Sequence, residues 1–268
     1  RNNGNRFVSD YIEDAMGGAI LEGSGVDYQR SRQVIVFYDG VYWGIHDMRE
    51  RYNKNYVETN YGIDASEATI IKHINKKIEA SNGTTAEYEA LLNFVYDSDF
   101  SGEKNANYET VKQLMDVENF AAYMAAEIYM HNGDWPNNNV RAWKSPNTKW
   151  KFMVYDLDHG FDWTWSVSGF YQSTNMFDWV KQGGYSSGKC YGGKSPSCFH
   201  TFYVQLIKNP DFKRMFINRA AMLFQNNVNA ENITSTIEKI VATIDADQMS
   251  RDMATFLQTE RWYSNSCA

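Results

Sequence analysis

Two acidic loops organise this chain: HNGDWPNNN at residues 131–139 and DLDHGF at residues 156–161. In the first loop the acid Asp134 precedes the amide Asn139 by five positions. An acid and an amide at this spacing, followed by a hairpin and a second acidic turn, are typical of proteins that transfer phosphoryl groups. Asp134 could accept a proton from a hydroxyl group. Asn139, with Asp156 or Asp158, could hold a divalent cation, because hard cations prefer oxygen ligands.

The segment between the loops predicts that they meet in space. Residues 140–144 and 149–155 are rich in strand formers and flank the turn SPNT at residues 145–148. A hairpin brings its two ends together, so Asn139 and Asp156 should be neighbours. A strand that continued through Asp156 and Asp158 would direct both carboxylates to the same side. One Asp/Asn loop is usually only a solvated turn, but two loops joined by a hairpin favour a binding site.

Length and composition limit the class of protein. The 268 residues are 43% hydrophobic and carry a formal net charge of −7. This size suits one large domain or two joined lobes, and the composition excludes a disordered chain. The negative charge argues against a nucleic-acid partner, and no apolar run reaches the ~20 residues that would span a membrane. The sequence starts at Arg1 without a leader segment, which favours a processed protein or an excised domain.

The remaining patterns predict an α+β protein with β-hairpins first and a mainly helical second part. A hairpin should cover residues 34–46, because Asp39-Gly40 suits a type I′ turn. We expect a strand at residues 69–74. The first helix should end at Gly17-Gly18, and Asp116 should cap the helix that leads to Gly133. Further helices are predicted at residues 84–96, 108–115, 202–208, 210–223 and 233–244.

Charged residues near the predicted strands are candidates for phosphate binding. Lys72 lies inside the strand at residues 69–74, and kinases use a strand lysine to hold the α- and β-phosphates. The alternative is an edge strand with Lys72 in water. Arg49 and Arg51 offer further cations after the first hairpin, and Glu50 is a candidate ion-pair partner for Lys72.

The cysteines leave two alternatives open. Cys190 and Cys198 bracket a loop rich in Gly, Ser and Lys, and a disulfide between them would order that loop. Such a disulfide would also place the protein outside the cytoplasm. The two residues could equally be unpaired thiols.

Taken together, these motifs resemble the spore-coat-protein-H (CotH) family of atypical protein kinases. The resemblance rests on YDGVYWG at residues 38–44, RER at residues 49–51, the two acidic loops, and LIKNPDF at residues 206–212, so it covers nearly the whole chain. It implies a divergent protein-kinase-like fold in a single domain spanning residues 1–268. Residues up to about 80 would be the small-lobe-like part, and residues from about 81 onward the helical lobe with the catalytic and metal loops.

The resemblance also implies an activity and a location. Members look like kinases that transfer the γ-phosphate of ATP to Ser/Thr of secreted, spore-coat or cell-surface proteins, and some belong to larger surface assemblies. ATP and Mg²⁺ or Mn²⁺ would be required, with Ca²⁺ as a further candidate ion. The substrate would be a protein, and this chain would be an extracellular or surface protein, most simply one secreted by a bacterium.

Position by position, Asp134 matches the catalytic-loop aspartate, Asn139 the metal-binding asparagine, and Asp156 or Asp158 the metal-binding aspartate. Lys72, Glu50 and Arg49 would serve the nucleotide phosphates. Family members usually carry a Gly/Ser turn and a Lys-Lys strand upstream of the position where this sequence begins. Because this sequence does not include that segment, a non-catalytic binding module stays an alternative. A metal-dependent nucleotide-sugar transferase is another, because an Asp-X-Asp turn suits Mn²⁺-diphosphate, although the Asp134-to-Asn139 spacing argues against it.

Overall fold

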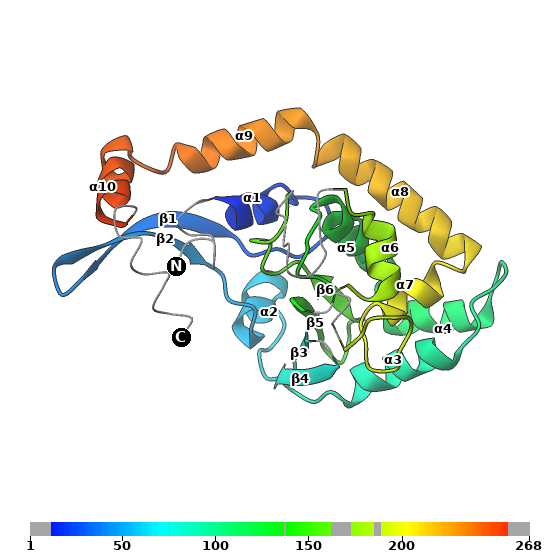
Figure 1. Cartoon of the computed structure of the whole chain (residues 1–268). Coiled ribbons are helices and arrows are strands. Elements are labelled where there is room, and N and C mark those ends of the chain that lie inside the picture. Colours follow the sequence, from blue (N-terminus) through cyan, green and yellow to red (C-terminus); the bar gives the residue numbers. More distant parts are fainter. Residues whose placement is uncertain (1–11, 75, 137, 162–172, 185–188, 257–268) are drawn as a thin grey trace.

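The computed structural model describes residues 12–74, 76–136, 138–161, 173–184 and 189–256. These residues form an α+β structure of two small antiparallel sheets and ten helices (Figure 1). The strands are β1 (Ser31–Tyr38), β2 (Val41–Arg49), β3 (Thr69–Ile74), β4 (Lys77–Asn82), β5 (Val140–Lys144) and β6 (Lys151–Met153). The helices are α1 (Glu13–Ala19), α2 (Lys54–Tyr61), α3 (Ala86–Asp97), α4 (Ala106–Leu114), α5 (Val117–Tyr129), α6 (Met176–Gln182), α7 (Thr201–Leu206), α8 (Pro210–Asn226), α9 (Ala230–Val241) and α10 (Ala246–Phe256).

Strands β1 and β2 form the predicted hairpin, a long ribbon that projects from the body of the molecule (Figure 1). Asp39 and Gly40 have φ angles of 48° and 78°, as a type I′ turn requires. The half of the ribbon nearer its turn is attached to α10, because Asp252 accepts hydrogen bonds from the Tyr42 hydroxyl and the Ile45 backbone N–H. Strand β2 continues three residues beyond the predicted end at His46, up to Arg49.

The second sheet has the strand order β4-β3-β5-β6 and separates two apolar clusters. On one face, Ile71, Ala142 and Phe152 pack into the main core, which includes residues of α5. On the other face, Ile70 and Trp143 pack with residues of α2. Successive residues of a strand point to opposite faces, so this sheet is held from both sides. The strands that flank the acidic loops are therefore firmly placed.

Helix α5 delivers the chain to the first acidic loop. As predicted, Asp116 caps it, with the carboxylate accepting a hydrogen bond from the Asn119 N–H. The helix ends at Tyr129, earlier than the predicted stop at Gly133. Helix α8 begins at Pro210, as predicted, and the structure shows that Asn209 caps it. Helix α8 packs against α5 and runs along the outer side of the helical part (Figure 1).

Two predictions of local structure are wrong. Gly17 and Gly18 do not end α1 but lie buried inside it. A side chain at Gly17 would meet Leu157 at 2.7 Å, so glycine is used here for close packing and not as a stop signal. Likewise, β6 ends at Met153, and Asp156 has a φ of 60°, so no strand aligns the carboxylates of Asp156 and Asp158.

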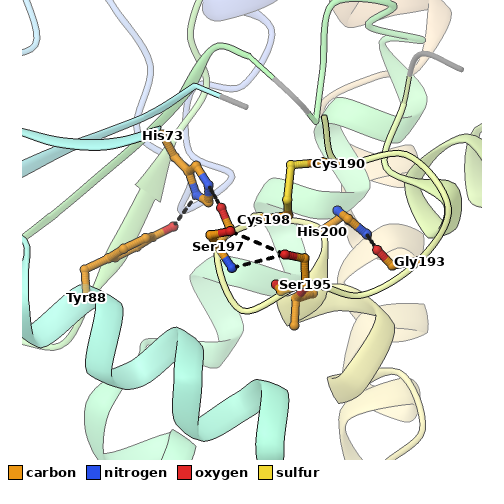
Figure 2. The surroundings of a disulfide bond; sticks show 9 residues. His73, Tyr88, Cys190, Gly193, Ser195, Ser197, Cys198 and His200 are labelled. Atoms are coloured by element: carbon orange, nitrogen blue, oxygen red, sulfur yellow. Dashed lines mark hydrogen bonds between the residues drawn. A yellow bond between two sulfur atoms is a disulfide. The ribbon is translucent and has the colours of Figure 1, made fainter. Parts of the chain in front are cut away.

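The disulfide between Cys190 and Cys198 is formed, which excludes the alternative of two unpaired thiols. It closes a loop that lies against the end of β3 (Figure 2). The backbone carbonyl of Ser197 is 2.8 Å from His73 Nε2, and that of Gly193 is 2.7 Å from His200 Nε2. Burial lowers the pKa of His200, so its imidazole is held neutral.

None of the helices in the described ranges is long and apolar enough to cross a bilayer.

Candidate active site

The two acidic loops lie side by side, as the hairpin between them predicts. The Gly133 N–H donates to the His159 carbonyl at 2.9 Å, and the Phe161 N–H donates to the Met130 carbonyl at 2.6 Å. A Cβ at Gly160 would lie 2.9 Å from the Met130 carbonyl oxygen, which only glycine avoids. Backbone hydrogen bonds therefore fix the relative position of the loops, independently of any ligand.

Asp134 is held by the amides of its own loop. Its Oδ1 accepts from Asn138 Nδ2 and its Oδ2 accepts from Asn139 Nδ2, both at 3.0 Å. The acid and the amide that the sequence places five positions apart are thus in direct contact. Because the amide nitrogen of Asn139 is used by Asp134, its carbonyl oxygen is the atom that would face a cation.

Asp156 lies in an unusually negative environment. Burial, followed by the nearby carboxylates of Asp158, Asp14 and Asp134, raises its pKa to about 7, and the guanidinium of Arg49 opposes this effect. Carboxylates gathered in this way repel one another unless a cation lies among them. The electrostatics therefore join both acidic loops into one site.

Asp158 has different surroundings. Its side chain is buried, and its Oδ1 lies 3.9 Å from Nε2 of the neighbouring His159. Asp156, by contrast, lines a pocket together with Tyr155, Asp14 and Arg49. Of the two aspartates that the sequence could not separate, Asp156 is the one on the pocket wall.

Buried Asp14 and half-buried Arg49 connect this pocket to the N-terminal part of the chain. Asp14, on α1, accepts a hydrogen bond from the Leu157 N–H at 3.0 Å and forms an ion pair with Arg49. Arg49 also pairs with Asp47 at 2.6 Å, and these two carboxylates raise its pKa despite the opposing effect of burial. Sequence reasoning found Arg49 but missed Asp14. The only signal was the pair Glu13-Asp14 inside an otherwise apolar stretch.

The expected ion pair between Lys72 and Glu50 does not form. Glu50 instead pairs with Arg30 at 2.6 Å, while Lys72 Nζ lies 4.0 Å from Glu79 on the adjacent strand. The reason is topological: Lys72 is on β3 of the four-stranded sheet, whereas Glu50 directly follows β2 of the separate hairpin.

With this geometry in place, the comparison with known families is decisive. The model of the CotH kinase proteins matches residues 5–266, which is nearly the whole chain. The chain belongs to the CotH kinase family. No curated protein matches it.

The oxygen atoms at the two acidic loops of this CotH family member could hold a divalent ion whose coordination is completed by phosphates and water. Among the described residues, no three His, Cys, Asp or Glu side chains come together as a metal cage. Mg²⁺ in phosphoryl-transfer sites needs no such cage, because it takes one or two carboxylates and completes its shell with phosphates and water. Asn139 and Asp156 could supply such a partial set. A Ca²⁺ site, which needs about six to eight oxygen ligands, fits less well.

A buried acid supports the first acidic loop of this CotH family member from behind. Glu127, on α5, accepts a hydrogen bond from Asn132 Nδ2 at 3.0 Å, and Asn132 Oδ1 accepts one from the Asp134 N–H at 3.2 Å. Burial raises the pKa of Glu127 to about 8, with the Asn132 hydrogen bond opposing it. Glu127 is therefore uncharged at neutral pH, and sequence analysis did not single it out.

Backbone strain is concentrated in the same place. Of the six non-glycine residues with positive φ in the described ranges, four lie in these two loops: His131, Asn139, Asp156 and Phe161. Such conformations cost free energy and persist where the surrounding structure imposes them, as it does at functional sites.

Proposed function

We propose that this chain is an atypical protein kinase with a protein-kinase-like fold, transferring the γ-phosphate of ATP to a Ser or Thr hydroxyl of a protein. Membership of the CotH kinase family supports kinase chemistry. The observation that carries the assignment of residues is the contact of Asp134 with Asn139 beside Asp156. This acid, amide and acid correspond in role to the catalytic-loop and metal-binding groups of kinases.

In this proposal Asp134 accepts the hydroxyl proton as the hydroxyl oxygen attacks the γ-phosphorus. The bond from that phosphorus to the β–γ bridging oxygen breaks, and ADP leaves with the electron pair. Asn139 and Asp156 would hold Mg²⁺ or Mn²⁺, which neutralises charge on the phosphate oxygens when bound. Arg49, fixed by Asp14, would add positive charge to the pocket wall.

We further propose an extracellular or cell-surface location, of the spore-coat type. The disulfide between Cys190 and Cys198 supports it, because such bonds persist mainly in oxidising compartments. The acceptor would then be a secreted or surface protein.

The test is transfer of labelled γ-phosphate to a Ser/Thr-rich protein with Mg²⁺ or Mn²⁺ present. Asp134→Asn should lower the rate by about 10²–10⁴-fold, the usual contribution of a general base. The matched control is Asp178→Asn, which removes an exposed acid on α6, and it should leave the rate unchanged. Transfer by Asp134→Asn at the wild-type rate would contradict the assignment.

One observation favours a second candidate, a non-catalytic binding module of the same fold. Glu50 is paired with Arg30 and not with Lys72, so the strand-lysine ion pair of active kinases is not assembled from these residues. Thermal unfolding with ATP and Mg²⁺ separates the two candidates. An active kinase should gain about 2.7 kcal/mol at a ligand concentration of one hundred times Kd, and a module without nucleotide binding should gain nothing.

A further inference from the structure

Two cations lie opposite each other on the face of the four-stranded sheet that packs against α2. Lys72 of β3 is directly opposite Arg141 of β5 in the antiparallel register. Directly opposed residues of an antiparallel pair lie on the same face, with Cβ atoms about 4.5–5.5 Å apart. Like charges in this position destabilise a sheet. The pairing therefore calls for an explanation, which an anionic ligand would supply.

The alternation of the strands shows which face this is. Ile70 and Trp143, two positions away on each strand, pack against α2. Lys72 and Arg141 continue the same row beyond that apolar cluster. The opposite face, with Ile71 and Ala142, belongs to the main core.

The row leads to the candidate active site. Arg141 is two residues after Asn139, and its guanidinium lies 4.0 Å from the ring centroid of Tyr155, the residue before Asp156. Its Nη1 donates to the Val140 carbonyl at 3.0 Å. The stacked ring and this bond hold the guanidinium plane in place, which prepares its remaining N–H groups for a planar anion.

Protein carboxylates neutralise the pair only in part, because Glu79, opposite Lys72 on β4, reaches only Lys72 of the two. Within the described ranges, Arg141 has no ion-pair partner, and the Lys72–Glu79 pair is long at 4.0 Å, with Lys72 38% exposed and Glu79 48% exposed. Lys77 shares the same glutamate at 3.6 Å. Exposed pairs of this kind contribute little, so Lys72 and Arg141 keep most of their attraction for an anion.

We propose that Lys72 and Arg141 together bind the phosphate chain of the nucleotide next to the metal-binding loops. This rests on the proposed kinase function for the identity of the ligand. Lys72 thus keeps the phosphate role expected from the sequence, but its companion is Arg141 of β5 and not Glu50. Arg141 supplies a fork of N–H donors, and Lys72 supplies a compact charge on the opposite strand.

Calorimetric titration of the purified chain with inorganic tripolyphosphate, and separately with Mg²⁺-ATP, tests the site. Arg141→Gln and Lys72→Gln should each raise the Kd of both ligands by about tenfold or more, since charge-assisted hydrogen bonds are lost. Lys77→Gln is the matched control: it removes an equal charge beside the same Glu79, and should change Kd less than about twofold. Arg141→Lys should fall between Arg141→Gln and wild type, because it keeps the charge and loses the planar fork.

Thermal unfolding of each variant without ligand shows whether the fold is kept. If Arg141→Gln unfolds, Arg141→Lys and Lys72→Gln still test the site. Wild-type Kd values in both Arg141→Gln and Lys72→Gln would overturn the site. An equal loss of affinity in Lys77→Gln would also overturn it. So would unchanged nucleotide Kd values with a raised KM for the acceptor protein alone.

If tripolyphosphate binds through these residues but no phosphoryl transfer occurs, the kinase function fails and the anion site stands. If transfer proceeds in both variants with unchanged KM for ATP, the site fails and the function stands.

Discussion

Asp156 and Asp158 are separated by one residue, yet the fold gives them different surroundings. The left-handed backbone at Asp156 breaks the alternation that a strand would impose, so Asp156 lines the pocket and Asp158 is buried beside His159. The sequence pattern Asp-X-Asp contains no information about this break. Which aspartate serves a ligand is therefore decided by backbone geometry, and only a structure supplies it.

If Asp156 is the metal ligand, Asp156→Asn should lower phosphoryl transfer on the order of 10²-fold or more, because metal binding contributes several kcal/mol to transition-state stabilisation. It should also abolish the rise in unfolding temperature caused by Mn²⁺ together with ATP. Asp158→Asn, the neighbouring control, should keep most of that rise. The reverse order of the two variants would move the metal site to Asp158.

Glu127 should make stability depend on pH. Its pKa is about 8 in the fold, whereas the ordinary value is 4.5, so the folded state keeps a proton that the unfolded state has lost. Between these values the free energy of unfolding should fall as pH rises, by on the order of 1.4 kcal/mol per pH unit. Glu127→Gln stays neutral and can still accept from Asn132, so its urea-unfolding free energy should decline less between pH 5 and 8. Parallel pH curves for the two proteins would contradict this prediction.

At the scale of elements, local signals predicted much of the fold. The Asp39-Gly40 turn, the Asp116 cap and the Asn209-Pro210 helix start depend on adjacent residues, and all three are confirmed. The side-by-side position of the two acidic loops followed from hairpin geometry. The attachment of α1 to the second acidic loop depends instead on contacts between distant segments. Gly17 there looked like a helix stop because its packing partner, Leu157, is far away in the sequence.

The two glycines of α1 allow that packing to be tested. Alanine at Gly17 would place its Cβ 2.7 Å from Leu157, whereas at Gly18 the nearest atom is the Gln29 carbonyl oxygen at 3.4 Å. Gly18→Ala should gain up to about 1 kcal/mol from helix propensity. In Gly17→Ala the displacement of the loop should cancel this gain in stability. The same displacement should weaken Mg²⁺-ATP binding. Chemical denaturation and calorimetry measure both effects. Equal behaviour of the two variants would show that α1 does not position the loop.

The loop between Cys190 and Cys198 is closed by one covalent bond in addition to its hydrogen bonds. A closed loop of this length contributes about 2–3 kcal/mol in the chain-entropy description. Reduction should therefore lower the unfolding temperature, and the double variant Cys190→Ala/Cys198→Ala should show the same lowered value with or without reductant. If reductant also lowers the unfolding temperature of the double variant, the effect comes from another site.

For the whole molecule, the carboxylate of Asp14 is the link between separate parts of the chain. It joins α1 to the backbone of Leu157 and to Arg49 at the end of β2. Among the described residues, the hairpin and the four-stranded sheet share no strand pairing, and the contact of Asp14 with Arg49 is one of the side-chain contacts that couple them at this site. The proposed division into a small-lobe-like part and a helical part would place the nucleotide where these contacts meet.

A nucleotide bound at the acidic loops should then stabilise β2 as well as the loops. Hydrogen exchange with Mg²⁺-ATP should slow in β2 and in residues 130–136 and 156–161 of the wild type. Asp14→Asn can still accept from the Leu157 N–H but loses the charge that holds Arg49, so protection of β2 should fall while protection of the loops remains. Glu22→Ala, an exposed acid just beyond α1, is the control and should behave as wild type. Full protection of β2 in Asp14→Asn would show that the two parts are coupled by other contacts.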